Sequence, residues 1–394
     1  MNRFLLLLSF LVVFLAEILR VYLVMPFPGS QQTETVAIAY WLNNNINYVR
    51  LIALIIAALP LMNILRQGAR WEKALSTIML GTWLVIFFLF NYRYQADRIF
   101  YQPTTKTFIP GSESTDKTKL VIGVVIDGQA KAYPIQLIGY HHQVMDTIGN
   151  TAVMVTYCTV CRAGRAFSPL VDGKPTSFRL VGMDHFNAIF EDRDTKSWWQ
   201  QATGVAITGP SKGKVLKEFP STQLTLDSWL RQYPGSLVLQ PDTLFDERYF
   251  RLEDYDRGTM PGPLVRRDTY SWQPKSWVVG VKNDGLSKAY DWNDLEKYRI
   301  IQDSISNLAI LLAIDSDTNN FHAFNRRLNG LILNFQLGQD HTQLIDQNTN
   351  SLWNLDGLCI AGSFKGQRLE RVQAYNEFWH SWQTFNKNVK VYRY

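Results

Sequence analysis

Three long apolar stretches within the first hundred residues limit what this part of the chain can fold into. Phe4–Met25 is almost wholly apolar and matches the roughly 20 helical residues that cross a bilayer. Val49–Leu65 and Ala74–Phe90 are shorter and similarly apolar. Because lipid offers no hydrogen-bond partners, such segments satisfy their backbone groups as helices. We therefore predict three transmembrane helices in residues 1–92, followed by a linker at residues 93–118.

Basic residues predict how these helices cross the membrane. Arg3 precedes the first stretch, and Arg66 and Arg70 lie between the second and the third. The connection at residues 26–48 contains no Lys or Arg. Positive loops stay on the cytoplasmic side, so we expect a multi-pass protein of the cytoplasmic (inner) membrane with its N-terminus inside. The large C-terminal part is then extracytoplasmic, or periplasmic.

The first stretch and the loop after it carry polar features of their own. Glu17 and Arg20 are spaced so that they can pair with each other on a helix, or extend toward the membrane interface. Thr35–Leu42 contains Tyr and Trp, which favour the headgroup region, so we expect it to lie along the membrane surface. The lipid bilayer is therefore one predicted partner.

The sequence beyond residue 118 repeats itself. VIGVVIDGQAKAYP from Val121 recurs as VVGVKNDGLSKAYD from Val278. This predicts an α+β, mainly β, internally duplicated soluble domain, with a first repeat at residues 119–240, a connector at 241–276 and a second repeat at 277–394.

A further repeated motif separates scaffold residues from a candidate ligand contact. DRDTKSWW from Asp192 recurs as DQNTNSLW from Asp346, so the shared Asp, Thr and Trp are expected to stabilise a turn. Arg193 is replaced by Gln347 in the second copy, which makes Arg193 the candidate cofactor-binding residue of this motif.

The first copy alone contains a Cys-x-x-Cys pair. Val153–Tyr157 alternates as a half-buried strand does, which places Cys158 at the strand end and Cys161 three residues later. Asp315 and Thr318 stand at the equivalent positions of the second copy. Chemistry is therefore expected in the first repeat.

The residues around the pair narrow its interpretation. Arg162 and Arg165 are expected to favour the thiolate, which is the nucleophile and metal ligand. Arg162 also stands where haem attachment requires a histidine. A four-cysteine zinc site would need a second pair, whereas only Cys359 remains, and we expect that residue to be packed in the core.

A thioredoxin-like site is not expected either, because the pair would then open a long helix. Pro169 follows within a few residues, and Asp172-Gly173 predicts a hairpin turn. The remaining interpretations are a thiol or metal site on a β scaffold, a local disulfide, or two buried thiols.

Two adjacent histidines precede the pair. His141 and His142 are separated from Cys158 by a short strand, so neighbouring strands can bring an imidazole toward the thiols. Cys158, Cys161, His141 and His142 together suit zinc or copper. Without a metal, His141 is expected to act as a base for the Cys158 thiol, with Cys161 as the second catalytic thiol. Further candidate metal ligands are Met183 and His185.

These motifs together resemble the DUF3179 family, prokaryotic proteins that carry a domain of unknown function. The resemblance covers roughly Val121 to Tyr392 and rests on GVVIDGQAKAYP, VTYCTVC, DRDTKSWW and FWHSWQTF. The two-copy layout with one cysteine motif is also similar to that family. Thr159 stands where the family usually has proline, and His142 where it usually has glutamate. The resemblance implies no activity.

The working hypothesis is a membrane-anchored extracytoplasmic protein with a thiol-based metal site, for copper or zinc, or a redox site. The alternative is a non-enzymatic ligand-binding or protein-interaction module that uses the cleft between the copies. Three helices where one would anchor also suggest membrane-protein partners in a larger complex. The net charge of +6 is spread thinly and no basic block occurs, so nucleic acid is not an expected partner.

Overall fold

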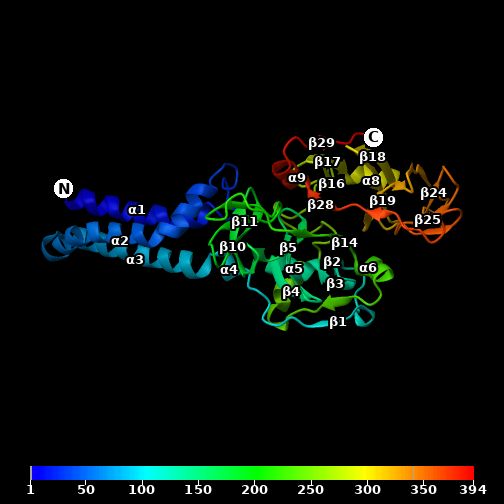
Figure 1. Ribbon diagram of the computed structural model, residues 1–394. Helices are drawn as coiled ribbons and strands as arrows, with labels where there is room; N and C mark the ends of the chain where they lie inside the picture. The colour runs from blue at the N-terminus through cyan, green and yellow to red at the C-terminus, as the bar shows by residue number, and fades with distance from the viewer. Residues whose placement is uncertain (1, 340) are drawn as a thin grey trace. The chain divides into compact units, whose positions relative to one another are not determined.

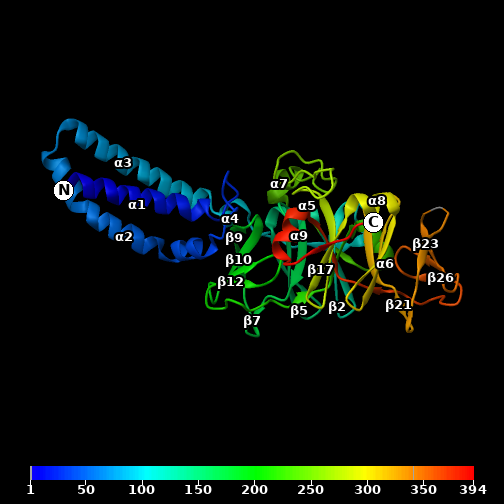
Figure 2. The same cartoon turned by 90° about the horizontal axis from the view of Figure 1, so that it is seen from above.

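Each apolar stretch forms a helix that is long and apolar enough to cross a membrane (Figures 1 and 2). In the computed structural model, which describes residues 2–339 and 341–394, these helices are α1 (Asn2–Tyr22), α2 (Val36–Gln67) and α3 (Arg70–Phe88). A short π-helical turn, η1 (Leu89–Arg93), continues α3.

The predicted membrane-surface segment is not separate from the second span. Residues 36–42 form the first turns of α2, which runs without a break for 32 residues. Good helix formers, Ala and Leu among them, lie on both sides of the Asn-rich stretch at residues 43–47, and Pro60 is tolerated inside the helix. The surface segment and the second span are therefore one element.

The prediction that Glu17 pairs with Arg20 or reaches the membrane interface is wrong. The side chain of Glu17 is fully buried, and its two carboxylate oxygens accept hydrogen bonds from Arg50 of α2 at 2.6 and 2.8 Å. Arg20 instead donates to the carbonyl oxygen of Phe90 (2.9 Å) and to Asn91 Oδ1 (2.8 Å). A carboxylate buried among apolar helices needs a close cation, and the guanidinium of a facing helix offers two parallel donors.

The chain forms two compact units, and unit 1 combines the long helices with a small sheet. It comprises the chain up to Tyr101 and residues 176–200 and 204–215. Met183 on this sheet donates its backbone N–H to the carbonyl oxygen of Val24, just beyond α1, at 2.7 Å. The elements after η1 are α4 (Ala96–Ile99), β9 (Phe178–Asp184), β10 (Asn187–Asp192), β11 (Trp198–Gln200) and β12 (Ala206–Thr208), with the sheet order β12-β11-β10-β9.

Unit 2 holds the rest of the chain: Gln102–Pro175, Gln201–Thr203 and Leu216–Tyr394. Its first sheet has the order β1-β15-β3-β2-β14, and α6 covers it through the buried Trp229. A second sheet, β13-β6-β5-β4, carries the cysteine motif. The elements are β1 (Phe108–Pro110), η2 (Gly111–Glu113), β2 (Leu120–Ile126), β3 (Gln129–Pro134), α5 (Ile135–His141), β4 (Gln143–Ile148), β5 (Thr151–Cys158), β6 (Ala163–Phe167), β7 (Leu170–Val171), β8 (Lys174–Pro175), β13 (Glu218–Phe219), β14 (Ser221–Thr225), α6 (Leu226–Gln232) and β15 (Leu237–Leu239).

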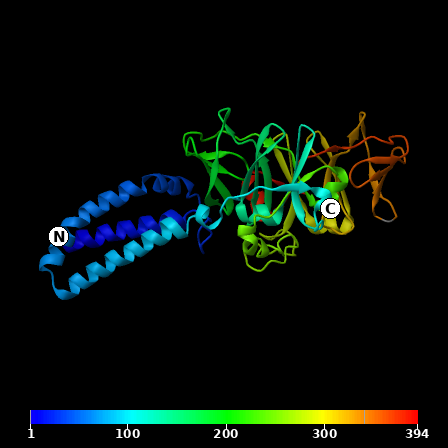
Figure 3. The ribbon, with the colours of Figure 1, turned by 90° about the horizontal axis from the view of Figure 1, so that it is seen from below.

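The later part of unit 2 contains three further main sheets, of which β23–β26 are coloured orange in Figure 3. Their orders are β28-β16-β17-β29, β18-β19-β20-β27 and β23-β24-β25-β26. The elements are η3 (Thr243–Phe245), α7 (Asp246–Phe250), β16 (Trp277–Asn283), β17 (Leu286–Asp291), α8 (Trp292–Tyr298), β18 (Ile300–Ile305), β19 (Leu308–Ile314), β20 (Phe321–Asn325), β21 (Arg327–Leu328), β22 (Leu331–Ile332), β23 (Phe335–Leu337), β24 (Gln343–Asp346), β25 (Leu352–Asn354), β26 (Cys359–Ala361), β27 (Glu370–Arg371), β28 (Ala374–Phe378), α9 (Trp379–Phe385) and β29 (Lys390–Val391).

The edge strands β14 and β28 bring the two parts of unit 2 together; we call the residues of 119–240 that belong to unit 2 the first half, and 277–394 the second half. The Gln373 side chain accepts from the backbone N–H of Ser221 (3.1 Å) and donates to its carbonyl oxygen (3.0 Å). These bonds satisfy an edge that would otherwise need water or another strand. The predicted mainly β, α+β class behind three apolar helices is confirmed.

Breaking the buried ion pair in unit 1 tests how the helices are held together. We expect Glu17→Gln to lower the free energy of unfolding by about 3–5 kcal/mol, because Arg50 then loses its counter-charge in a buried place. Denaturant unfolding of the full chain in detergent measures this. The double variant Glu17→Gln/Arg50→Met removes both charges and should recover most of the loss, whereas a single variant as stable as the wild type would contradict the assignment.

Candidate functional site

The cysteine motif lies at the end of a central strand, as predicted. The strand β5 ends at Cys158, but the expectation of a half-buried strand is wrong because Val153 to Cys158 are all buried. Neighbours cover both faces: Gln201 Nε2 donates to Thr156 Oγ1 at 3.1 Å, on the face that the alternation assigned to solvent. Alternation marks one buried face and does not reveal a second covering layer.

A tight turn, and not a helix, joins the two cysteines. The backbone N–H of Cys161 donates to the carbonyl oxygen of Cys158 at 3.2 Å, which closes a β-turn. Arg162 then has a positive φ of 56°, and β6 begins at Ala163. The turn places both side chains at one end of the sheet.

Cys158 and Cys161 form no disulfide, and both side chains are fully buried. The Cys161 side chain is hydrogen-bonded to that of Cys158. Burial raises the pKa of the Cys161 thiol well above its usual range, and the neighbouring Cys158 raises it further. The expectation that nearby arginines favour the thiolate is therefore wrong for Cys161.

The two arginines have other partners, which explains this result. Arg162 Nε donates to Asn376 Oδ1 at 2.6 Å, and its guanidinium lies 3.8 Å from the ring centroid of Trp277. Arg165 forms a buried ion pair with Glu377. Burial alone would lower the pKa of Arg165, but the carboxylate of Glu377 holds it above its ordinary value. Both cations therefore join the first half to the second.

Two residues that the sequence analysis did not single out lie beside the thiols. His380, the second residue of α9, lies beside the Cys161 thiol and lowers its pKa, against the larger effect of burial. Lys275 Nζ donates to the carbonyl oxygen of Val160 at 2.6 Å. Burial lowers the pKa of Lys275 to about 8, although Cys161 and Cys158 act in the opposite direction. Both residues are only partly exposed, whereas the sulfur atoms beneath them are buried.

The only signal for His380 in the sequence was its position within FWHSWQTF, a motif of the family resemblance. The backbone explains its placement, because the N–H of Phe378 donates to the carbonyl oxygen of Cys161 at 2.9 Å. This bond fixes the start of α9 against the cysteine turn.

The structure places His141 and His142 in other surroundings. His141 Nε2 lies 2.6 Å from the hydroxyl oxygen of Tyr249, among the rings of Tyr140 and Phe245. His142 Nδ1 lies 2.9 Å from the carbonyl oxygen of Tyr157. Burial lowers the pKa of His142 to about 4, so its ring is neutral at pH 7. The imidazole beside the Cys161 thiol is that of His380.

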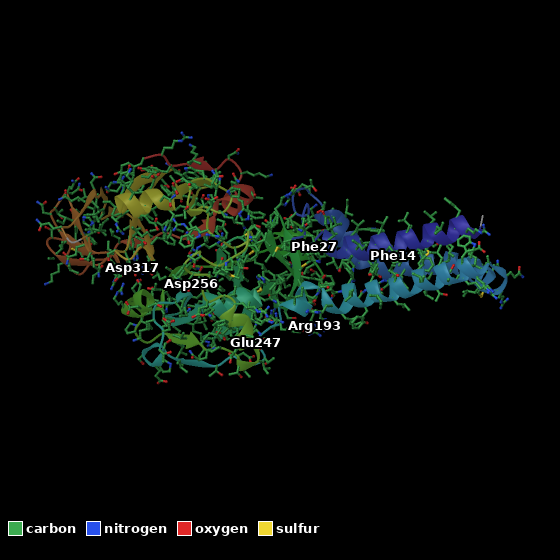
Figure 4. All side chains as sticks on the ribbon, turned by 180° about the vertical axis from the view of Figure 1, so that it is seen from behind. Phe14, Phe27, Arg193, Glu247, Asp256 and Asp317 are labelled. Carbon is green, nitrogen blue, oxygen red and sulfur yellow. The ribbon has the colours of Figure 1, made fainter. Side chains whose placement is uncertain are left out.

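The other sequence-predicted residues belong to unit 1. Arg193, labelled in Figure 4, is exposed. Met183 is buried, and His185 Nδ1 lies 2.7 Å from Asp184 Oδ1, a hydrogen bond that raises the pKa of His185. The predicted turn role of Asp192 is confirmed by the hydrogen bonds that it accepts from the backbone N–H of Thr195 (2.6 Å) and from Trp199 Nε1 (2.8 Å).

Comparison with known proteins identifies the family. The model of DUF3179, described as a protein of unknown function, matches residues 100–389. The chain belongs to the DUF3179 family. No curated protein and no solved structure matches it. The DUF3179 match contains Cys158, Cys161, Lys275 and His380, so the whole thiol site lies within the family's domain.

The donor set of this DUF3179 chain fits some metals better than others. Within residues 2–339 and 341–394, no group of three or more His, Cys, Asp or Glu side chains is placed to hold a metal ion. Zinc needs four ligands, or three and an open position, so these residues do not fit it. Soft Cu(I) prefers thiolate ligands, and Cys158 and Cys161 offer two sulfur atoms. Cys359, as predicted, is packed in a hydrophobic core.

Because His142 is buried and neutral, we expect the free energy of unfolding to depend on pH. Its pKa is about 4 in the folded chain and near 6.5 when exposed, so between these values the unfolded chain binds a proton that the folded chain does not. Stability should fall by about 3 kcal/mol as the pH drops from 6.5 to 4. Denaturant unfolding across this range measures it. Asn suits the positive φ of 60° at this position, so His142→Asn is a matched control. An equally steep pH dependence in that variant would refute the assignment to His142.

Proposed function

We propose that this protein is a membrane-anchored extracytoplasmic protein whose first half carries a redox-active thiol pair, Cys158 and Cys161. The observation that supports it best is the pair itself: two buried, reduced thiols on one turn, hydrogen-bonded to each other, with an imidazole and an ammonium beside them. Adjacent thiols of this kind can close to a disulfide with little movement of the chain.

The proposed reaction is thiol–disulfide exchange. When Cys158 and Cys161 form a disulfide, the two thiols lose two electrons and two protons, and an external disulfide takes them up and becomes two thiols. Because both sulfur atoms are covered, the reaction requires displacement of the side chains above them. This cover restricts access to small disulfides or to partners that open it.

The redox site makes a direct prediction for the full chain in detergent. After equilibration in glutathione buffers of increasing potential, unfolding and alkylation, mass spectrometry should show loss of two free thiols in one transition. The Cys359→Ser variant should keep this transition, and Cys158→Ser should lose it. Three alkylated thiols in the wild type at every potential would reject the redox function. The wild type could instead bind one equivalent of copper that the Cys158→Ser/Cys161→Ser variant does not bind. That result would favour a metal-binding function over the redox function.

The proposed orientation in the membrane is supported by the two ends of the helices in unit 1. At one end, Arg3 forms an ion pair with Glu72 at 2.6 Å, beside the basic connection of α2 and α3. At the other end, Val24 contacts the sheet of unit 1. With positive loops inside, this sheet lies outside the cytoplasm. Protease added to spheroplasts should remove a C-terminal tag and spare an N-terminal one; protection of both tags would contradict this orientation.

The proposed internal duplication is supported by matched details in the two halves. The order β2-β3-α5-β4-β5-β6 parallels β16-β17-α8-β18-β19-β20. A Cβ atom on Gly123 would lie 2.3 Å from the ring of Trp229, and one on Gly280 would lie 2.4 Å from that of Trp382. In each half, a tryptophan ring thus packs closely against a glycine, where a larger residue would clash with it. Sequences of further family members test this proposal, because their halves should align at the same offsets.

A second candidate function is favoured by a cavity between the halves. It has a volume of about 230 Å³ and combines aromatic walls with one cation, Arg371. This composition suits a small ligand that has an apolar body and an anionic group. The lining residues are Gly123, Val125, Pro220, Ser221, Thr222, Trp229, Tyr233, Phe321, Ala323, Arg371, Val372, Gln373 and Ala374.

Native mass spectrometry of the detergent-released full chain tests the cavity. A bound small molecule should be lost from Ala323→Trp, which fills the space, and from Arg371→Gln, while Cys158→Ser/Cys161→Ser should retain it. Absence of any bound mass in the wild type, or its retention in Ala323→Trp, would count against a ligand at this place.

A further inference from the structure

We infer that His380 is the proton acceptor for Cys161, so that Cys161 attacks the external disulfide first and Cys158 resolves the mixed disulfide. This inference rests on the proposed redox function and assigns the order of the two thiols. It also makes the second half, which has no cysteine pair, a contributor to the site.

The hydrogen bonds of His380 decide which ring nitrogen faces the thiol. His380 Nδ1 lies 3.0 Å from the carbonyl oxygen of Pro274. A carbonyl oxygen can only accept, so Nδ1 must carry the ring proton in the neutral imidazole. The other nitrogen, Nε2, is therefore the acceptor of the ring; it is buried, and the ring lies beside the Cys161 thiol. A nucleophile, a base and a group that orients the base are then all present.

The sulfur atoms of Cys161 and Cys158 have different surroundings. His380 and Cys158 both lie beside the Cys161 thiol and act on its pKa in opposite directions: Cys158 raises it and His380 lowers it. Cys161 is thus the sulfur beside the partly exposed imidazole, and Cys158 is the one next to it at the strand end. A disulfide that displaces the cover meets the base and Cys161 together.

Lys275 supplies a positive charge to the same pair. Its ammonium interacts electrostatically with both Cys161 and Cys158. It is also held in place, by its bond to Val160 and by the ring of Phe378, whose centroid lies 4.7 Å from Nζ. A cation beside a developing thiolate stabilises it, and it does so more strongly where water is excluded.

The inferred thiol–disulfide exchange proceeds in two steps. The proton of the Cys161 thiol passes to His380 Nε2, and the Cys161 sulfur attacks one sulfur of the external disulfide. The bond between the two external sulfur atoms breaks, and the leaving thiolate takes up the proton. Cys158 then loses its proton and attacks the Cys161 sulfur, the bond between Cys161 and the external sulfur breaks, and the second external thiolate takes up that proton and leaves as a thiol. The external disulfide is reduced by two electrons.

The test uses full-length chains that keep one thiol of the pair, in a Cys359→Ser background. Cys158→Ser leaves Cys161, and Cys161→Ser leaves Cys158. The probe is dithiodipyridine, a small disulfide that releases a coloured thione. We expect Cys161 to react faster than Cys158, and His380→Asn to slow Cys161 by about 100-fold, the usual range for loss of a general base. The same variant should remove one inflection from the pH–rate profile, and added imidazole should restore part of the rate.

Further measurements distinguish a wrong assignment of His380 from a variant that does not fold. Thermal unfolding of each variant shows whether His380→Asn folds, and His380→Gln provides a second variant of similar size whose amide cannot take up the proton. Lys275→Met should slow the reaction without removing the inflection. An unchanged rate and pH profile in the His380 variants, or a faster Cys158, overturns the assignment. The glutathione titration of the wild type still decides whether the pair is redox-active at all.

Discussion

The ion pair between Arg165 and Glu377 is the interaction on which the arrangement of unit 2 depends. Both side chains are almost completely buried, so each charge has lost its water and must be satisfied by the other and by neighbouring donors. Ser381 donates to the second carboxylate oxygen of Glu377 at 2.8 Å, and the ring of Tyr375 lies 3.6 Å from the Arg165 guanidinium. A buried pair of this kind contributes little net stability but penalises any other register strongly. It therefore selects one alignment of β28 against β6.

That alignment has a chemical consequence. Glu377 is followed at once by Phe378, whose N–H is bonded to Cys161, and His380 lies on the first turn of the helix that begins there. A shift of β28 by one residue would turn Glu377 away from Arg165 and would also move the imidazole from the thiol, because side chains alternate along a strand. The ion pair that joins the halves thus also positions the base.

How much could be predicted from the sequence follows from the range of each interaction. The apolar helices, the strand that ends at Cys158 and the Asp192 turn depend on neighbours within a few residues, and their patterns are readable. Arg165 and Glu377 are 212 residues apart, and nothing local marks them as partners. The sequence predicts Arg162 and Arg165 to stabilise the thiolate because they are close to the cysteines along the chain. It does not show which distant side chains bind these arginines in the fold. For the same reason the sequence favours His141, which is close to Cys158 along the chain, over His380 as the imidazole beside the thiols.

The second half shows what the same position becomes without sulfur. Asp315, at the place equivalent to Cys158, lies 2.8 Å from His322 Nε2 and accepts from Asn320 Nδ2 at 3.0 Å. Burial would raise the pKa of Asp315, but these partners hold it below its ordinary value, so the group stays a paired anion. A carboxylate with fixed partners locks its turn, whereas two adjacent thiols leave theirs able to change its bonding. On this argument the proposed duplication kept one frame, and the first half differs by a turn that we propose can exchange one covalent state for another.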